Sequence, residues 1–313
     1  MAFDGIVTKA IASELQQLSG ARVDKIFQPN SNNVIIGCYI NGKNYALNIC
    51  TNSNNYRIHL TTHPKPNPQI APNFCMVLRK HLTGLHIKNI ITANLERIIT
   101  IEFEGFDEVD DIINKKLIIE LMGKHCNIIL LNEENIIIDS LRHINNSDST
   151  HVVIPHTKYT YPSTEKLNFL NCNDFEDFKK HLSNVDTESL PWCISNTFNG
   201  ISKKFINFII SDLNIKDLKE IFYYLKQIIL DTDSLNLKFK TINNDYFLVQ
   251  NPNNNELFSL NFFIDDFYFN KESNEQFKNY RNTLLKLILD TLKKYKKRLY
   301  NIDEKLKECN DMD

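Results

Sequence analysis

The segment Pro72-Asn-Phe-Cys-Met-Val-Leu-Arg-Lys-His-Leu82, continued by Leu95-Glu-Arg-Ile-Ile-Thr-Ile-Glu-Phe103, decides the fold. Pro72 suits the first turn of a helix, and Gly84 marks its end. After a short connection, apolar residues alternate from 98 to 103, which predicts a strand. The helix is predicted because residues of one buried face recur every three or four positions: Phe74, Val77, Leu78, His81, Leu82 and Leu85.

A charged pair, Glu96-Arg97, stands at the entrance of the predicted strand. Extended chain sends adjacent side chains to opposite faces, so these two residues cannot simply pair with each other. Each is therefore expected to find another partner, in the fold or in a ligand.

Composition describes an ordinary globular protein. A chain of 313 residues suggests two or three domains, and its net charge of -2 argues against a uniformly basic nucleic-acid binder but allows a local basic surface. Seven cysteines without a Cys-x-x-Cys pair fit reduced thiols, so we predict no metal site and no cofactor. With no signal peptide and no membrane span, the expected location is the cytoplasm.

Residues 1–168 have the pattern of an α+β domain with antiparallel sheets. Asp4 is the natural N-cap of a helix from Asp4 to Leu18, a role worth about 1 kcal/mol. Asn41-Gly42 is a strong hairpin signal between two strands. Further strands are predicted at 56–61, 117–122, 127–131 and 136–138, an extended proline-rich connector at 63–72, and a solvated acidic loop at 104–111.

Residues 169–232 change to helical spacing, with helices predicted at 175–182, 190–198, 203–210 and 218–230. The glycine-containing corner Phe198-Asn-Gly-Ile-Ser202 resembles a helix-hairpin-helix module, which would aim backbone N–H groups at a phosphate. The same corner also fits simple helix packing. Strands predicted at 235–242, 245–250 and 257–262 would complete the first domain within 233–268, making the helical module an insertion.

Residues 269–313 are predicted to be the first strand of a coiled coil whose partner strand is absent. The alternative is an ordinary surface helix. The prediction rests on a heptad seam: Leu285, Ile288, Leu292, Tyr295, Leu299, Ile302, Leu306 and Cys309.

Four blocks together resemble the NFACT family, which includes bacterial RqcH, also called fibronectin-binding protein A, and the eukaryotic nuclear export mediator factor. The blocks are the segments 57–61, 74–82 and 120–130 and the pair Glu96-Arg97, where family members usually carry Asp-Arg. The resemblance implies an N-terminal part of such a protein. It also implies a domain like the N-terminal domain of formamidopyrimidine-DNA glycosylases, although the N-terminal proline nucleophile and paired Glu of those enzymes are missing here.

The resemblance further implies a function in ribosome-associated quality control. Such a protein binds obstructed large ribosomal subunits carrying peptidyl-tRNA, contacts their rRNA, and recruits tRNA, in bacteria alanine tRNA, for template-free C-terminal tailing. The ribosome would form the peptide bond, so no enzyme activity and no catalytic residue is expected. The alternative function is a surface adhesin for fibronectin or fibrinogen.

Three residues are implied to face tRNA on one surface: Asp4, Glu96 and Arg97. The alternative for them is an internal salt bridge that pins helix to sheet. Candidate contacts to RNA phosphates are Arg79, Lys80, Lys203, Lys204, Lys293, Lys296 and Lys297. The last three lie off the heptad seam, where a merely solvated helix face is the competing interpretation.

Overall fold

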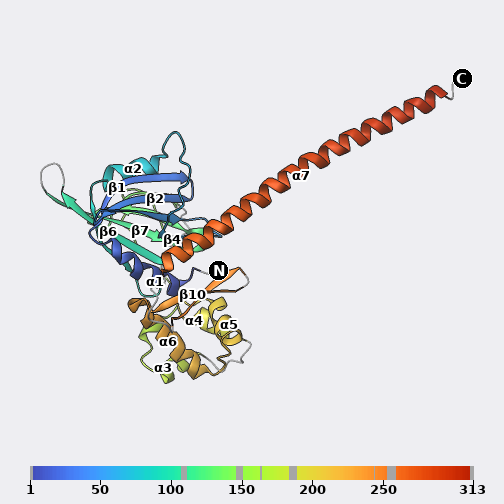
Figure 1. Ribbon diagram of the computed structural model, residues 1–313. Helices are drawn as coiled ribbons and strands as arrows, with labels where there is room; N and C mark the ends of the chain where they lie inside the picture. Colours follow the sequence, from blue (N-terminus) through green and yellow to red (C-terminus); the bar gives the residue numbers. More distant parts are fainter. Residues whose placement is uncertain are drawn as a thin grey trace. The chain divides into compact units, whose positions relative to one another are not determined.

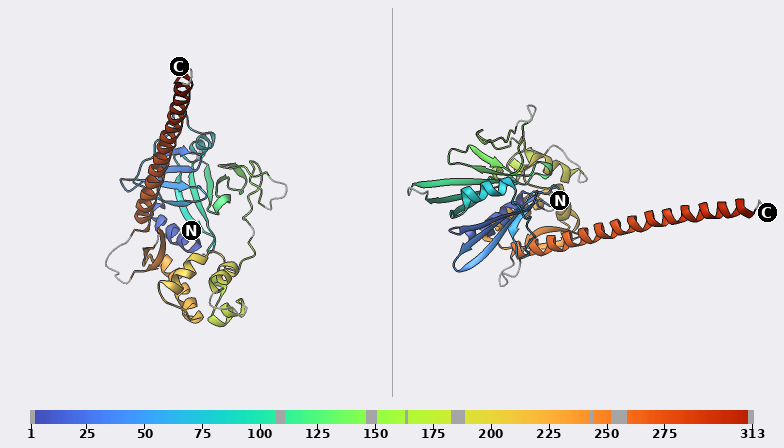
Figure 2. Two further views of the ribbon diagram at one scale, coloured as in Figure 1. Left: turned by 90° about the vertical axis from the view of Figure 1, so that its right-hand side faces the viewer. Right: turned by 90° about the horizontal axis from the view of Figure 1, so that it is seen from above.

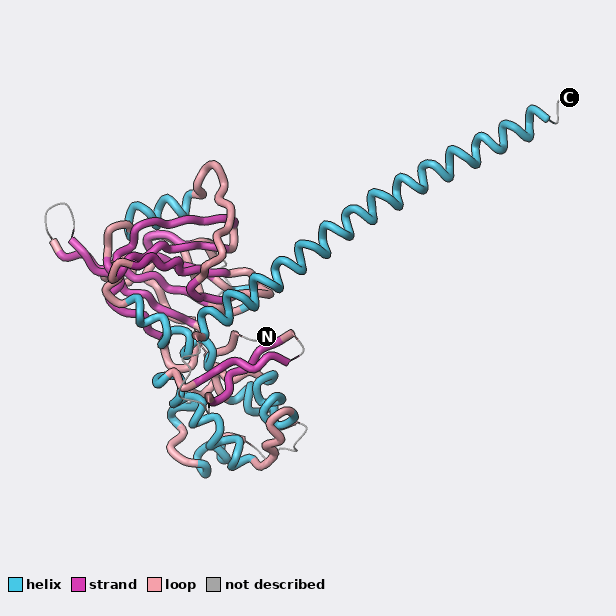
Figure 3. Tube along the Cα trace, in the orientation of Figure 1, coloured by secondary structure: helices cyan, strands magenta, loops and turns pink. Residues whose placement is uncertain are grey.

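The computed structural model describes residues 3–106, 111–145, 151–162, 164–182, 189–242, 244–251 and 259–310 (Figure 1, Figure 3). The chain divides into two units, Met1–Asp265 and Asp266–Asp313, which are described separately. The first unit combines one large antiparallel sheet with helices, so the predicted α+β class is confirmed. Residues 107–110 of the predicted acidic loop and 252–255 of a predicted turn lie outside the described residues.

The large sheet has nine strands in the order β4-β3-β2-β1-β5-β6-β7-β8-β9. Asn41 and Gly42 both have positive φ, at 51° and 75°, and join β2 to β3 as the predicted tight hairpin. The bounds are β1 (Arg22–Asn30), β2 (Asn33–Ile40), β3 (Lys43–Cys50), β4 (Arg57–Leu60), β5 (His86–Thr92), β6 (Ile98–Phe106), β7 (Ile112–Glu120), β8 (Asn127–Leu131) and β9 (Ile137–Ser140).

The sheet bends so that its two halves face each other as layers (Figure 2). Arg142, just after β9, donates from Nη2 to Asn32 Oδ1 at 2.6 Å, in the turn between β1 and β2. Isoleucine and leucine side chains of both halves fill the interior. Two strands, β1 and β5, were missed by the pattern because register shifts at Val23/Lys25 and Ile87/Asn89 break their alternation.

Two helices lie against the sheet. Helix α1 (Gly5–Leu15) runs on into a 3₁₀ turn, η1 (Gln16–Leu18), as the sequence predicts. Helix α2 (Asn73–Leu82) packs on β1 with Phe74, Cys75, Leu78 and Leu82 buried. Val77 and His81, predicted on the same face, are only half-buried at its margin.

A buried hydrogen-bond network holds the segment 151–162 onto the sheet. The Glu120 carboxylate, fully buried at the end of β7, accepts hydrogen bonds from Tyr159 Oη at 2.8 Å and from His151 Nε2 at 2.9 Å. This hydrogen bond raises the pKa of His151 and favours its charged form beside the carboxylate. The segment therefore leaves the sheet at a fixed place on its way to the helical region.

The helical region contains four α-helices among its described residues, α3 (Phe175–Lys180), α4 (Leu190–Thr197), α5 (Lys203–Ser211) and α6 (Leu218–Ser234), and a 3₁₀ turn, η3 (Phe169–Asn171). All four helices match the predictions within a few residues. Phe169, Phe178, Phe198 and Phe222 pack ring against ring at the centre of this region, with centroids 5.1 to 5.7 Å apart.

The strands β10 (Leu237–Ile242) and β11 (Asp245–Gln250) form a separate two-stranded sheet. The hairpin packs against α6, where Asp231 accepts a hydrogen bond from Gln250. That these strands complete the first domain around an inserted helical module stays a prediction. The predicted strand at 257–262 is wrong for its described part. Helix α7 (Leu260–Asn310) begins there, with Ser259 Oγ accepting from the N–H of Phe262.

The first turns of α7 cover the edge strand of the large sheet. Asn261 Oδ1 accepts a hydrogen bond from the N–H of Leu60 at 2.8 Å, and the buried Asp265 carboxylate accepts from the Thr62 N–H at 2.7 Å and from Thr61 Oγ1 at 2.6 Å. Side chains of α7 thus replace the missing next strand of the sheet. The 57–61 block therefore contains an edge strand, β4, whose open side is covered by α7.

We expect Asp265→Ala to lower the free energy of unfolding by about 3 kcal/mol, because it removes a buried carboxylate that accepts hydrogen bonds from both Thr61 and Thr62 and ties α7 to the sheet edge. Asp266→Ala, at an exposed neighbour, is the matched control and should change it by less than about 0.5 kcal/mol. Urea denaturation followed by circular dichroism measures both. Equal effects of the two substitutions would contradict the role of Asp265 in holding α7 on the sheet edge.

This contribution should also depend on pH. Burial opposes ionisation of Asp265, but the hydrogen bonds from Thr61 and Thr62 and the charge of His59 outweigh it and lower the carboxyl pKa. A lowered pKa stabilises the fold above the unfolded pKa near 4, and the stabilisation is lost as pH falls through the folded value. The difference between wild type and Asp265→Ala should therefore shrink in acid.

The second unit consists of helix α7 from Asp266 onward. Residues 273–307 are all exposed, the described heptad positions among them, from 44% for Leu285 to 60% for Leu299, so the coiled coil stays a prediction. Lys293, Lys296 and Lys297 are exposed on the same helix.

Candidate functional site

A pocket of about 220 Å³ opens where three segments far apart in sequence meet: the N-terminus of α1, the turn before β6, and the loop between α4 and α5. It brings two of the three residues implied to face tRNA, Asp4 and Arg97, to one place, together with the predicted phosphate contact Lys203. Its polar lining includes Asp4, Tyr56, Arg97, Lys166, Ser202 and Lys203.

The pocket is held together by close backbone contacts. The N–H of Gly5 donates to the carbonyl of Gly200 at 2.9 Å, and both glycines lie against the carbonyl oxygen of Leu95. A Cβ atom would come within 1.9 Å of that oxygen at Gly5 and within 2.1 Å at Gly200. Gly200 also has φ of 77°, a conformation that glycine adopts without strain. The predicted glycine corner therefore serves here as a close backbone joint.

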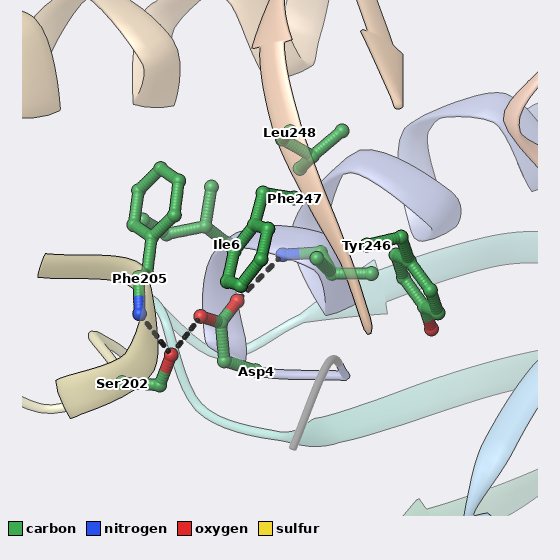
Figure 4. Close-up of a pocket in the computed structure, with 8 residues that line it drawn as sticks. Asp4, Ile6, Ser202, Phe205, Tyr246, Phe247 and Leu248 are labelled. Carbon is green, nitrogen blue, oxygen red and sulfur yellow. Dashed lines mark hydrogen bonds between the residues drawn. The ribbon is translucent and has the colours of Figure 1, made fainter. Parts of the chain in front are cut away.

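Asp4 links two helix starts (Figure 4). Its Oδ1 accepts from the N–H of Val7 at 3.2 Å, which confirms the predicted N-cap, and its Oδ2 accepts from Ser202 Oγ at 2.8 Å. Ser202 Oγ in turn accepts from the N–H of Phe205 and caps α5. Burial raises the pKa of Asp4, while the hydrogen bonds of Ser202 and Val7 and the charge of Arg97 oppose that rise.

Arg97 and Glu96 face different surroundings, although the pair lies in the turn before β6 and not in the extended chain that the sequence predicted. Arg97 donates from Nη1 to Tyr56 Oη at 3.0 Å and lines the pocket. Glu96 does not line it. Burial raises the pKa of Glu96. The pKa of Tyr159 is raised by burial, by Glu120 and also by the charge of Glu96. The structure therefore brings Asp4 and Arg97 together and leaves Glu96 outside the pocket.

Positive charge exceeds negative charge in the pocket. Arg97, Lys166 and Lys203 face one carboxylate, that of Asp4, and none of the three forms an ion pair with another described residue. Lys166 Nζ donates to the carbonyl of Ser195 at 2.6 Å, and burial and the nearby charge of Arg97 lower the pKa of this lysine. An anion placed here would relieve that repulsion, with the positive N-terminal end of α5 beside it.

The other predicted phosphate contacts lie elsewhere. Lys204 forms an ion pair with Asp245 at 2.5 Å, and Arg79 donates from Nε to the carbonyl of Ile26 at 2.8 Å and lies over the ring of Phe27. Lys80 is exposed on α2. Of the seven candidates, Lys203 alone lines this pocket.

Sequence reasoning missed Tyr56, Lys166 and Ser202. Ser202 carried a signal, since a serine directly before a helical segment is a common N-cap. Lys166 and Tyr56 carried none, because they reach the pocket only through tertiary contacts. Within the described ranges, no group of three or more His, Cys, Asp or Glu side chains could hold a metal ion, and no helix is long and apolar enough to cross a membrane.

Curated relatives share part of their length with this chain. It is 36% identical to the Rqc2 homolog RqcH of Bacillus subtilis over 66% of this chain and 36% of that protein. It is 28% identical to the Rqc2 homolog RqcH of Streptococcus suis over 98% of this chain and 55% of the relative. An archaeal Rqc2 homolog, aRqcH of Methanocaldococcus jannaschii, is 30% identical over 68% of this chain. The chain thus spans about a third to a half of these relatives.

Solved structures agree with the fold. The fibrinogen binding protein from Staphylococcus aureus superposes with a TM-score of 0.70 at 30% identity, covering 86% of this chain and 99% of that one. The N-terminal part of the fibronectin/fibrinogen-binding protein from Streptococcus suis gives 0.71 at 28% identity, covering 86% and 100%. The model of the NFACT N-terminal and middle domains matches residues 4–313, and the chain therefore belongs to the NFACT family.

Proposed function

We propose that this protein acts in ribosome-associated quality control, where it binds obstructed large ribosomal subunits carrying peptidyl-tRNA and recruits tRNA for template-free C-terminal tailing. Membership of the NFACT family and the relatives named Rqc2 homolog RqcH support the pathway. The observation that supports tRNA binding most directly is the pocket in which Arg97, Lys166 and Lys203 face the single carboxylate of Asp4.

The pocket suits a segment of RNA. Its cations offer charge-assisted hydrogen bonds to phosphate oxygens, and the Asp4 carboxylate, the Tyr56 hydroxyl and the Asn199 amide can select among hydrogen-bond donors and acceptors of a nucleotide. The NFACT resemblance makes tRNA, and alanine tRNA in particular, the proposed ligand. Glu96 would act from outside the pocket, at a different edge of the same turn.

The proposed contribution of the protein is recognition, in the cytoplasm. The ribosome, not this chain, would form the peptide bond. Helix α7 would add contacts to rRNA, because between Asp290 and Glu308 seven basic residues stand against four acids. Lys293, Lys296 and Lys297 are exposed and lie off the apolar seam, so they can reach phosphates while the seam is covered.

RNA that co-purifies with the affinity-tagged chain tests this function. We expect tRNA together with large-subunit rRNA. Replacing Lys293, Lys296 and Lys297 with glutamine should deplete the rRNA and keep the tRNA, and the salt dependence of large-subunit binding should flatten by roughly one log-log unit per lost contact.

The matched control replaces Lys179, Lys180 and Lys219 with glutamine, three exposed helical lysines of the other unit, and should change neither RNA. An unchanged salt slope in the α7 variant, with its helix intact by circular dichroism, would show that its basic face only keeps the helix soluble. Purified chain without tRNA or rRNA would contradict the proposed function.

Fibronectin or fibrinogen binding is the second candidate, favoured by the names of the solved relatives. Binding of the RNase-treated chain to immobilised fibronectin measures it. Saturable binding by a chain that carries no cellular RNA would favour this candidate over the first.

A further inference from the structure

The single tryptophan of the chain, Trp192, lies on the surface of α4 with 56% of its area exposed. The opposite side of the helix is buried through Leu190, Pro191 and Ile194. A large aromatic side chain left in water forgoes roughly 1.5 to 3 kcal/mol of burial and offers an apolar ring to a partner.

Helical spacing places Trp192 beside the cationic pocket. Ser195 and Asn196, three and four residues further along α4, line the pocket and share the face of Trp192. One helical turn is about 5 Å long, so the backbone of Trp192 lies about one turn from these two lining residues. An aromatic face next to a cluster of cations is the arrangement that binds single-stranded nucleic acid.

The neighbourhood of Trp192 is fixed by hydrogen bonds. Ser195 Oγ donates to the carbonyl of Trp192 at 3.0 Å, and the carbonyl of Ser195 accepts from Lys166 Nζ, itself part of the pocket wall. The turn that carries the tryptophan is therefore tied directly to one of the cations. A phosphate held by Lys166 would leave its own or the adjacent base within reach of the indole.

We propose that Trp192 is a stacking platform for an unpaired nucleobase of the RNA whose phosphate enters the pocket of Arg97, Lys166 and Lys203. The inference rests on the proposed function and names the feature of the RNA that this site takes: a single-stranded stretch, such as a loop, rather than a duplex. Stacking on an aromatic ring tolerates any base, so Trp192 would contribute affinity more than sequence preference.

The test uses the fact that the chain has one tryptophan, whose fluorescence reports on this position alone. Unfractionated tRNA and a single-stranded oligouridylate should quench the emission, whereas inorganic polyphosphate, which carries the charge without bases, should bind the cations and leave most of the emission unchanged. Anisotropy of labelled tRNA measures binding independently. Trp192→Ala should weaken tRNA binding about tenfold, and Trp192→Phe should restore part of the loss.

Tyr223→Ala is the control, since Tyr223 is an aromatic residue of α6 with nearly the same exposure, 55%, and does not line the pocket. It should bind tRNA as wild type does. If tRNA binds wild type and Trp192→Ala equally and the emission stays unquenched, the stacking role is wrong and the proposed function stands. If the wild-type protein binds no RNA by anisotropy, the stacking role and the proposed function are both wrong. Quenching by polyphosphate equal to that by RNA would also overturn stacking.

Discussion

Arg97→Gln is expected to weaken tRNA binding ten- to a hundredfold while leaving the melting temperature within about 3 °C of wild type. A charge-assisted hydrogen bond to phosphate is worth about 1.5 to 3 kcal/mol, and losing one phosphate contact should lower the salt slope by about one. The fold should tolerate the change, because the one side-chain hydrogen bond of Arg97 among the described residues is that to Tyr56 Oη.

Tyr56→Phe separates the contribution of the Arg97 charge from that of the hydrogen bond between Arg97 and Tyr56. It removes the hydroxyl that holds Arg97 and keeps the charge, so tRNA affinity should fall by less than about threefold. Filter binding at several salt concentrations and thermal denaturation give the two readouts. A large drop in melting temperature for Arg97→Gln with unchanged tRNA binding would favour the internal pinning role instead, with the charge acting on Asp4 rather than on RNA.

Gly200→Ala is expected to destabilise the protein by about 4 kcal/mol or more and to abolish binding at the pocket. The new Cβ would lie 2.1 Å from the carbonyl oxygen of Leu95, and all the atoms around it belong to backbone or to a buried leucine. The joint between α1, the α4–α5 loop and the turn before β6 would have to open.

Gly42→Ala is the matched control, because Gly42 has φ of 75° against 77° for Gly200 but has no atom within 4 Å of its added Cβ. The Gly42→Ala variant has only the strain of a positive φ, so it should lower the free energy of unfolding by about 1 kcal/mol. Urea denaturation compares the two variants. Equal destabilisation would mean that the strain of positive φ, and not the packing against Leu95, explains the need for glycine at the pocket.

The regular elements could be predicted where the residue pattern is strong. The long C-terminal helix, the Asn41-Gly42 hairpin and the Asp4 cap follow from local physics, and the structure contains all three. β1 was missed because its bulge interrupts the alternation. The strand predicted at 257–262 failed because the short apolar run around Leu260 fits a strand as well as a helix start, and the contacts with β4 select the helix.

The candidate site could be predicted only in part. Asp4 and Arg97 came from the family resemblance, and the structure places both in one pocket. Their partners are distant in sequence: Ser202 lies 198 residues from Asp4, and Lys166 reaches Ser195 across 29 residues. Contacts between residues so distant in sequence leave no periodic pattern of residues, because they form only through tertiary packing. Lys204 shows the converse, since its charge looked available in the sequence and is neutralised by Asp245 across 41 residues.

The joint of Gly5, Leu95 and Gly200 also sets an order of events during synthesis. A ribosome delivers the chain from its N-terminus, so the strands through β9 emerge and can pair before Gly200 exists. Until the α4–α5 loop has emerged, Asp4 lacks Ser202, and Lys203 has not yet been made. A nascent chain that stops short of this loop carries a sheet but no pocket, so the candidate tRNA site forms only after Lys203 has been translated.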